Sequence, residues 1–236
     1  MQKGTLYLLP ALLGDSSPEH VIPEGVLQRM HALKLFAVEN IRSARRFLIK
    51  SGIQNPVDDL EFLELNRHTK EMELMDIVMR LAQGENIGLL SESGTPCVAD
   101  PGANLVNKAH EFEIPVKPLT GPSSILLGLA GSGFSGQCFS FHGYLPIDDK
   151  KREHKLRFLE KLVFKEDQTQ IFIETPYRNL KMFNAILKVC SANTKLSIGI
   201  ELTTAREKIM SYTIAEWKLK KTPQIHKKNV IFLIYK

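Results

Sequence analysis

The chain has 236 residues, of which 43% are hydrophobic and 24% are charged. These proportions are those of an ordinary globular protein, and they exclude the disordered and fibrous classes. The formal net charge of +5 favours polyanionic partners without requiring one.

Cysteine usage and the first residues predict the cellular compartment. Cys97, Cys138 and Cys190 are scattered without a CxxC pair, which indicates reduced thiols rather than a disulfide framework or a zinc site. The start, MQKGTLYLLPALLGD, resembles a signal peptide, but Pro10 interrupts its apolar run and no small-residue cleavage site follows. We therefore expect a first strand here, and a cytoplasmic protein with no membrane span and no metal.

Apolar runs of strand length recur along the chain, at residues 5–9, 34–38, 86–90, 114–119, 169–174, 196–202, 207–213 and 229–235. Apolar residues at three- and four-residue spacings predict helices over 69–83, 103–111 and 177–190. This alternation predicts an α/β fold with a mainly parallel sheet in the first half. The last three strands follow one another with little helix between them, which predicts a mixed sheet in the second half. We expect two α/β domains, 1–119 and 120–236, with a hinge in LTGPSS (119–124).

A literal dinucleotide-binding pattern, GxGxxG, occurs at residues 131–136. It binds a pyrophosphate only where it follows a strand and begins a helix. Here it follows the helix-like SSILLGLA and precedes the apolar CFSF, so we predict a glycine-rich helix end.

The segment SESGTPCVADPG (91–102) follows the apolar run NIGLL. Ligands of open α/β sheets bind beyond the carboxyl ends of strands, where glycine lets them approach the backbone. A rigid connection to a helix, with Asp100 as N-cap and Pro101 in the first helical position, would use the same residues. The loop alone leaves both interpretations open.

Five blocks in order resemble the tetrapyrrole methylase superfamily: SESGTPCVADPG, LTGPSSILLGLAGSGF, FSFHGYLP, IFIETPYRN and ELTTAREKI. Within it they are most similar to the enzymes that methylate the 2′-hydroxyl of a cytidine in 16S ribosomal RNA. With the opening GTLYLL, the resemblance covers nearly the whole chain.

The resemblance implies S-adenosylmethionine (SAM) bound in a cleft between two α/β domains, within a homodimer. It assigns cofactor contacts, residue by residue, to Pro10, Ser93, Gly94, Thr95, Ser123, Ser124, Glu174, Thr175, Leu202 and Thr203. The loop that carries Gly94 would then hold the methyl donor with backbone amides and one hydroxyl.

The chain also departs from the pattern of these relatives. It has ALLGD where they have TPIGN, Glu39-Asn-Ile-Arg42 where they have EDTR, and one histidine, His68, where they have H-x-HN. Glu92 replaces the aspartate of SDAGTP, and Thr204 replaces the lysine of ELTK. Most changes fall in blocks that we assign to the substrate side, so methyl transfer is better supported than the particular substrate.

A ribose hydroxyl needs a base or a polarising cation to become a nucleophile. The candidates are Glu39, His68 and Glu92, and the sequence does not rank them. Glu39 and Arg42, one helical turn apart, suit either a substrate clamp or an exposed ion pair. Cys97 is expected to pack rather than react.

Basic residues form a candidate RNA surface made of Arg42, Arg45, Arg46, Lys150, Lys151 and Arg152, within a Lys150–Arg157 patch. A solvated helix face explains the patch equally well.

The leading interpretation is a SAM-dependent methyltransferase whose partner is ribosomal RNA or the small ribosomal subunit. Methylation of a carbon in a tetrapyrrole precursor, and a non-catalytic SAM- or RNA-binding protein, stay open as alternatives.

Overall fold

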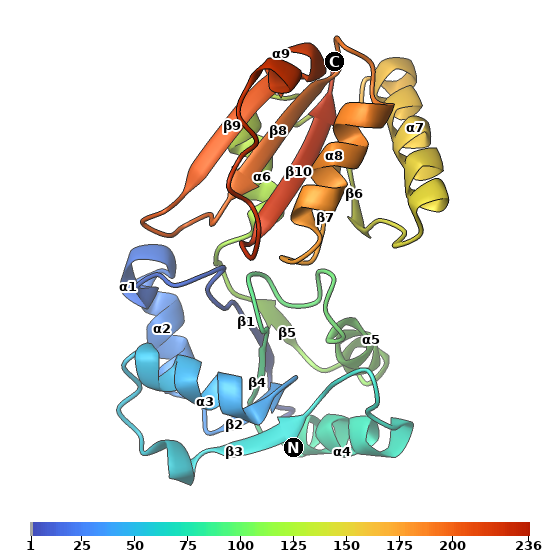
Figure 1. The fold of residues 1–236 in the computed structure, drawn as a ribbon. Helices are drawn as coiled ribbons and strands as arrows, with labels where there is room; N and C mark the ends of the chain where they lie inside the picture. Colours follow the sequence, from blue (N-terminus) through green and yellow to red (C-terminus); the bar gives the residue numbers. More distant parts are fainter. Residues whose placement is uncertain (1) are drawn as a thin grey trace. The chain divides into compact units, whose positions relative to one another are not determined.

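The computed structural model describes residues 2–236. They group into two compact units: the first ends at Pro122, and the second is Ser123–Lys236. The division falls inside the segment 119–124 that the sequence predicts as a hinge. Each unit contains a five-stranded sheet with helices on both faces (Figure 1).

The first unit alternates strands and helices. In chain order its elements are β1 (Leu6–Leu9), α1 (Pro18–Val21), α2 (Glu24–His31), β2 (Leu35–Val38), α3 (Ile41–Lys50), the 3-10 turn η1 (Val57–Asp59), β3 (Glu61–Glu64), α4 (Glu71–Ala82), β4 (Ile87–Leu90), α5 (Ala103–Glu111) and β5 (Val116–Pro118). The strands pair in the order β3-β2-β4-β1-β5, and every pair is parallel.

Both faces of this parallel sheet are buried, which explains why β1, β2 and β4 read as continuous apolar runs. Successive side chains of a strand point to opposite faces. Leu6 and Leu8 pack with the apolar side chains of α4 and α5, whereas Tyr7 and Leu9 pack with those of α2 and α3. The sheet is therefore the middle of three layers, and its carboxyl edge is left for loops.

The second unit has a mixed sheet. Its elements are α6 (Ser124–Ser132), β6 (Phe139–Tyr144), α7 (Asp149–Glu166), β7 (Thr169–Ile173), α8 (Asn179–Val189), β8 (Lys195–Ile200), β9 (Lys208–Thr213), α9 (Ile214–Leu219) and β10 (Val230–Tyr235). The strand order is β6-β7-β10-β8-β9, with β6 and β7 parallel and the other pairs antiparallel.

Helices α7 and α8 cover one face of this sheet, and α6 covers the other (Figure 1). Phe172 and Phe232 stack in the core under α7 and α8, with ring centroids 5.9 Å apart. Small residues let α6 lie close to the sheet: a Cβ on Gly128 would come within 2.9 Å of Ile231, and one on Gly131 within 2.2 Å of Ile209.

The predicted fold class is confirmed: two α/β domains, the first with a parallel sheet and the second with a mixed sheet. The GxGxxG segment is a helix end as predicted, because Gly133 (φ 74°) is the left-handed C-cap of α6. Strand β3 and helix α9 were not predicted. The sequence of β3, EFLE, has no apolar run of strand length. It forms a strand through its pairing with β2, which the sequence does not show.

Candidate functional site

The carboxyl ends of all five strands of the first sheet meet at one edge, because the strands are parallel. Three of the segments that leave this edge touch one another. Ala11, after β1, exchanges two backbone hydrogen bonds with Gly94, after β4 (N···O 2.9 and 3.2 Å). The Thr95 hydroxyl donates to the carbonyl of Pro122, after β5, at 3.4 Å. The predicted cofactor loop is thus built into the sheet edge.

Gly94 supplies a left-handed turn (φ 70°) rather than a free amide. Its N–H and C=O are both bonded to Ala11. A Cβ at this position would lie 2.9 Å from a Leu13 methyl group and 3.3 Å from the Pro122 oxygen. The Gly94 amide is therefore already bonded, so a donor held by backbone amides of this loop would use the amides of its neighbours, and the contact of Gly94 with the donor stays a prediction.

Backbone strain is concentrated in the same loop. Cys97 (φ 66°) and Ala99 (φ 60°) adopt the left-handed conformation that glycine favours. Such strain persists where the surrounding structure imposes it, and it clusters at ligand sites. Burial, followed by the charge of Asp100, raises the pKa of Cys97 to about 11, so the thiol is protonated at neutral pH. Cys97 packs rather than reacts, as predicted.

Asp100 is not the N-cap of α5, contrary to the sequence prediction. Helix α5 begins after Gly102, which has no side-chain cap. Asp100 instead accepts hydrogen bonds from Gly102 N (3.0 Å) and from the Ser91 hydroxyl (3.1 Å). That hydroxyl also accepts from the backbone N–H of Ser93 at 3.2 Å. The aspartate therefore fixes the loop, whose exposed Ser93 side chain stays available to a ligand.

Three carboxylates gather at the ends of β2 and β4. Burial raises the pKa of Glu39, and the nearby Asp100 and Glu92 raise it further, whereas Arg67 partly offsets them. The exposed Glu92 accepts a hydrogen bond from Ser43 Oγ at 2.5 Å. A raised pKa makes a carboxylate a better proton acceptor, so the surroundings of Glu39 suit a general base.

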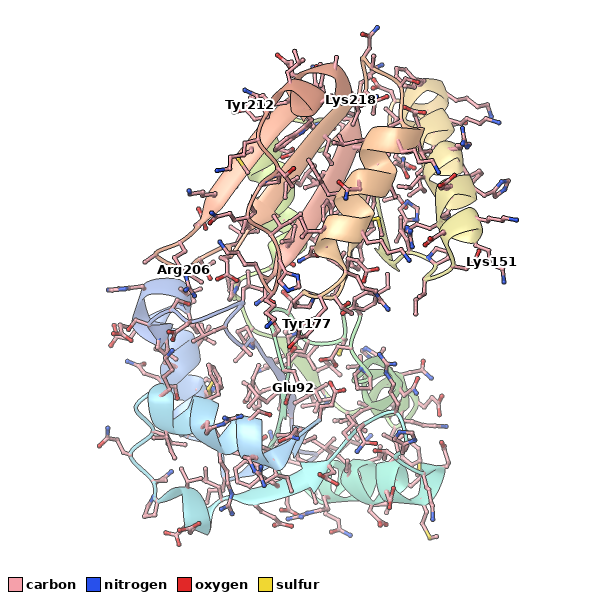
Figure 2. The ribbon with its side chains drawn as sticks, in the orientation of Figure 1. Glu92, Lys151, Tyr177, Arg206, Tyr212 and Lys218 are labelled. Carbon is pink, nitrogen blue, oxygen red and sulfur yellow. The ribbon has the colours of Figure 1, made fainter. Side chains whose placement is uncertain are left out.

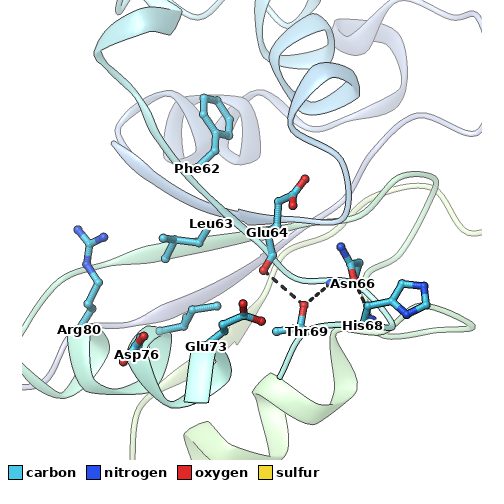
Figure 3. A pocket seen from close by; sticks show the side chains of 10 residues that line it. Phe62, Leu63, Glu64, Asn66, His68, Thr69, Glu73, Asp76 and Arg80 are labelled. Carbon is cyan, nitrogen blue, oxygen red and sulfur yellow. Dashed lines mark hydrogen bonds between the residues drawn. The ribbon is translucent and has the colours of Figure 1, made fainter. Parts of the chain in front are cut away.

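His68, the third candidate base, is exposed and follows β3 (Figure 3). It sits at the end of a groove of about 460 Å³ beside β3 and α4. The groove is also lined by Glu64, Glu73 and Asp76. Those carboxylates repel phosphate groups, so the groove does not suit RNA.

The second sheet also gathers predicted residues at one edge. Strands β6, β7 and β8 run in the same direction, so their carboxyl ends meet there. After β7, the buried Glu174 accepts from the Thr175 N–H at 2.5 Å and pairs with Arg178 at 2.8 Å. Its carboxylate thereby holds the loop and leaves Thr175 for direct contact with a ligand.

The residues after β8 show an unpartnered polar group. Glu201 (φ 49°) and Thr203 (φ 69°) both adopt left-handed backbone conformations, on either side of Leu202. Within residues 2–236, the Thr203 hydroxyl is buried and has no hydrogen-bond partner. A buried hydroxyl without a partner is costly. A polar ligand that supplies the partner would remove that cost, so Thr203 fits the cofactor role that the sequence assigns to it.

Ser123 and Ser124 begin α6. Ser123 is the N-cap and its hydroxyl accepts from Leu126 N at 3.5 Å. Pro10 is buried where β1 ends, and a Cβ on Gly121 would lie 2.1 Å from it. The predicted cofactor residues therefore lie at the carboxyl edges of the two sheets and at the start of α6.

The predicted RNA surface is only partly available. Arg42 and Arg46 are exposed on α3, whereas Arg45 pairs with Asp58 at 3.1 Å. On α7, Lys150 and Lys151 are exposed, and Figure 2 shows Lys151 pointing away from the helix.

Arg152 does not belong to this surface, contrary to the prediction. Its side chain is 5% exposed, and it bonds to the Ile147 carbonyl at 2.9 Å and to Asp149 at 2.6 Å. It falls on the helix stripe that continues through Leu156, Leu159 and Val163, which faces the core.

Within residues 2–236, no group of three or more His, Cys, Asp or Glu side chains could hold a metal ion, and no helix is long and apolar enough to cross a membrane.

Comparison with known proteins identifies the family. The model for Tetrapyrrole (Corrin/Porphyrin) Methylases matches residues 29–218. The chain belongs to this family. Membership confirms the predicted enzyme class, a methyltransferase, and the predicted cofactor, SAM.

The curated relatives are similar over most of the chain. One from Haemophilus influenzae, named Ribosomal RNA small subunit methyltransferase I, is 32% identical over 219 residues, which are 92% of this chain and 73% of that protein. A protein of the same name from Escherichia coli O157:H7 is 29% identical over 91% of this chain and 71% of its own length.

Solved structures share the fold at low identity. The methyltransferase CobJ matches with a TM-score of 0.64 at 16% identity, covering 99% of this chain and 94% of its own. Cobalt precorrin-4 methyltransferase CbiF matches with a TM-score of 0.62 at 16% identity, covering 98% and 94%. At this identity the likeness shows the fold alone, and both structures support the assignment of two α/β domains.

Proposed function

We propose that this methyltransferase acts on ribosomal RNA of the small subunit, at the 2′-hydroxyl of a cytidine in 16S RNA. One observation carries the proposal: relatives aligned over about nine-tenths of the chain bear the name Ribosomal RNA small subunit methyltransferase I. The net charge of +5 and the exposed lysines of α7 suit a polyanionic substrate.

The proposed donor site uses residues from both sheets. Direct contacts are assigned to Ser93, Thr95, Ser123, Ser124, Thr175, Leu202 and Thr203. Pro10, Gly94 and Glu174 shape the loops that present them, as their own contacts indicate. The Thr203 hydroxyl, which lacks a partner within residues 2–236, carries this assignment best. A location of the donor between the two units stays a prediction.

When bound, SAM would supply a methyl group activated by its sulfonium, and S-adenosylhomocysteine would be the leaving group when a nucleophile bonds to the methyl carbon. The residues of the protein then have two tasks. Alignment of the two reactants is worth an effective molarity of order 10⁵ M or more. Glu39, whose pKa is raised by burial and by its acidic neighbours, accepts the proton of the 2′-hydroxyl at its carboxylate as the oxygen attacks.

The test is methyl transfer from radiolabelled SAM to unmodified small ribosomal subunits, with a tetrapyrrole precursor as a parallel acceptor. We expect label in 16S RNA. Label in the tetrapyrrole alone would show the alternative substrate, and label in neither would show a protein that binds without catalysing transfer. SAM binding measured by calorimetry separates this last case from misfolded protein.

We also propose a homodimer located in the cytoplasm, as the family resemblance implies. Sedimentation equilibrium of the purified chain tests the dimer. A single species with the mass of one chain across the accessible concentrations would contradict it.

A further inference from the structure

Tyr177 presents an aromatic ring to solvent at the carboxyl edge of the second sheet. It lies in the loop between β7 and α8 and is 71% exposed (Figure 2). Tyrosine combines an apolar ring with a polar hydroxyl and is enriched at binding interfaces. Folding of the loop does not require the ring, since the side chain is mostly outside the core.

The loop under Tyr177 is held rigidly by a second turn. Strand β10 is antiparallel to β7, which places the turn before β10 beside the end of β7. Lys227 N donates to the Pro176 carbonyl at 2.9 Å. The fully buried Asn179, at the start of α8, donates to the carbonyls of Ile225 and Lys228 at 3.0 and 2.8 Å. These three bonds hold the loop that carries the ring before any ligand binds.

Two side chains of that turn border the ring. The His226 ring meets Tyr177 edge-on, with centroids 6.1 Å apart, and Lys227 Nζ lies over the Tyr177 ring, 5.7 Å from its centroid. Lys227 has a left-handed backbone (φ 60°), which lysine rarely adopts. A tyrosine ring that is 71% exposed, with an ammonium group over it, offers a stacking surface to a base and a cation to the phosphate that follows it in single-stranded RNA.

Tyr177 is close in the chain to residues that we assign to the donor site. Glu174 and Thr175, assigned to that site, lie in the same loop as Tyr177. We propose that Tyr177 is a stacking platform for a base of single-stranded RNA beside the methylated nucleotide, with Lys227 contacting a phosphate. This inference rests on the proposed function. It names Tyr177 as a side chain that contacts the proposed RNA substrate.

The experiment measures binding and transfer separately. Fluorescence anisotropy follows a labelled single-stranded oligocytidylate, and transfer of label from SAM to small subunits gives KM and kcat. The variants are Tyr177→Ala, Tyr177→Leu, Tyr177→Phe and Lys227→Gln. Phe164→Ala is the matched control, because Phe164 is an aromatic residue of α7 that is 51% exposed. Thermal midpoints and SAM affinity verify that each variant is folded.

We expect Tyr177→Ala and Tyr177→Leu to weaken oligocytidylate binding by between about 5-fold and about 100-fold, which corresponds to one stacked base. Tyr177→Phe keeps the ring and should bind like wild type. Lys227→Gln should flatten the slope of log affinity against log salt by about 0.7, the value for one phosphate of a single strand. In transfer assays KM should rise more than kcat falls.

Unchanged RNA affinity in Tyr177→Ala would overturn the inference, and so would an equal loss in Phe164→Ala. Loss of tetrapyrrole binding without loss of RNA binding would also overturn it. The proposed function fails separately, when wild-type protein leaves 16S RNA unlabelled. RNA binding that depends on Tyr177 would still support the platform in that case.

Discussion

Replacing Gly94 with valine tests the role of the loop after β4. Gly94 has a φ of 70°, and a Cβ there meets a Leu13 methyl group at 2.9 Å and the Pro122 oxygen at 3.3 Å. The left-handed conformation costs a side chain about 1–2 kcal/mol. The methyl group of Leu13 can move aside, but the backbone oxygen of Pro122 yields only if the end of the first unit shifts. We expect Gly94→Val to lower the free energy of unfolding by about 1–3 kcal/mol and to weaken SAM binding.

Gly52→Val is the matched control. Gly52 has a φ of 80°, and nothing lies within 4 Å of a Cβ built there. The variant should therefore lose a similar free energy of unfolding from backbone strain while it keeps the SAM affinity of wild type. Calorimetry with SAM and chemical denaturation of both variants supply the two readouts. Wild-type SAM affinity in Gly94→Val, or an equal loss of affinity in Gly52→Val, would refute the reasoning.

Three further predictions concern single side chains. Glu39→Gln should lower kcat by about 10²- to 10⁴-fold without weakening SAM binding. Because the pKa of Glu39 is raised in the folded state, the wild-type kcat should begin to fall, as pH decreases, at a pH above the ordinary glutamate pKa. At neutral pH the folded state carries the cost of an ionised Glu39, so the variant should be more stable than wild type. A variant kcat that stays at the wild-type level would exclude Glu39 as the base. Thr203→Val removes a buried hydroxyl without a partner in residues 2–236, so the thermal midpoint should hold or rise while SAM binding weakens by about 0.5–1.5 kcal/mol; intact SAM affinity would remove Thr203 from the site. Arg152→Ala leaves the Ile147 carbonyl without its donor and should lower the free energy of unfolding by about 1–3 kcal/mol. Lys151 is exposed, so Lys151→Ala should change the free energy of unfolding by less than about 0.5 kcal/mol. Equal effects of the two variants in denaturant titrations would show that the burial of Arg152 contributes nothing to stability.

Sequence patterns predict those strands in which every residue is apolar or small. Strands β1, β2 and β4 are buried on both faces, so their apolar runs are visible without the structure. The sequence does not predict strand β3, because it lies at the sheet edge and has only two apolar residues, Phe62 and Leu63, between two glutamates. The burial of Arg152 can be inferred from the sequence, because its spacing from Leu156, Leu159 and Val163 places the arginine on the apolar stripe of α7.

The sequence predicts which loops form the candidate site, but it does not predict the hydrogen bonds that these loops make. The family blocks locate the segments after β4, β7 and β8, and all three segments begin at the carboxyl edge of a sheet. Asp100 was misassigned as a helix cap because its bond to Ser91 joins two ends of one loop, and no local pattern shows that pairing. The exposure of Tyr177 and the unpartnered hydroxyl of Thr203 depend on tertiary packing in the same way.

The central claim, transfer of a methyl group from SAM to a cytidine ribose of 16S RNA, is tested most directly by mass spectrometry of the RNA product. Unmodified small subunits are incubated with the protein and SAM, and the 16S RNA is then digested to nucleosides. The account predicts that 2′-O-methylcytidine forms with wild-type protein and is strongly reduced with Glu39→Gln. A methyl group found only on a base, or a 16S RNA that stays unmodified while a tetrapyrrole is methylated, would contradict it.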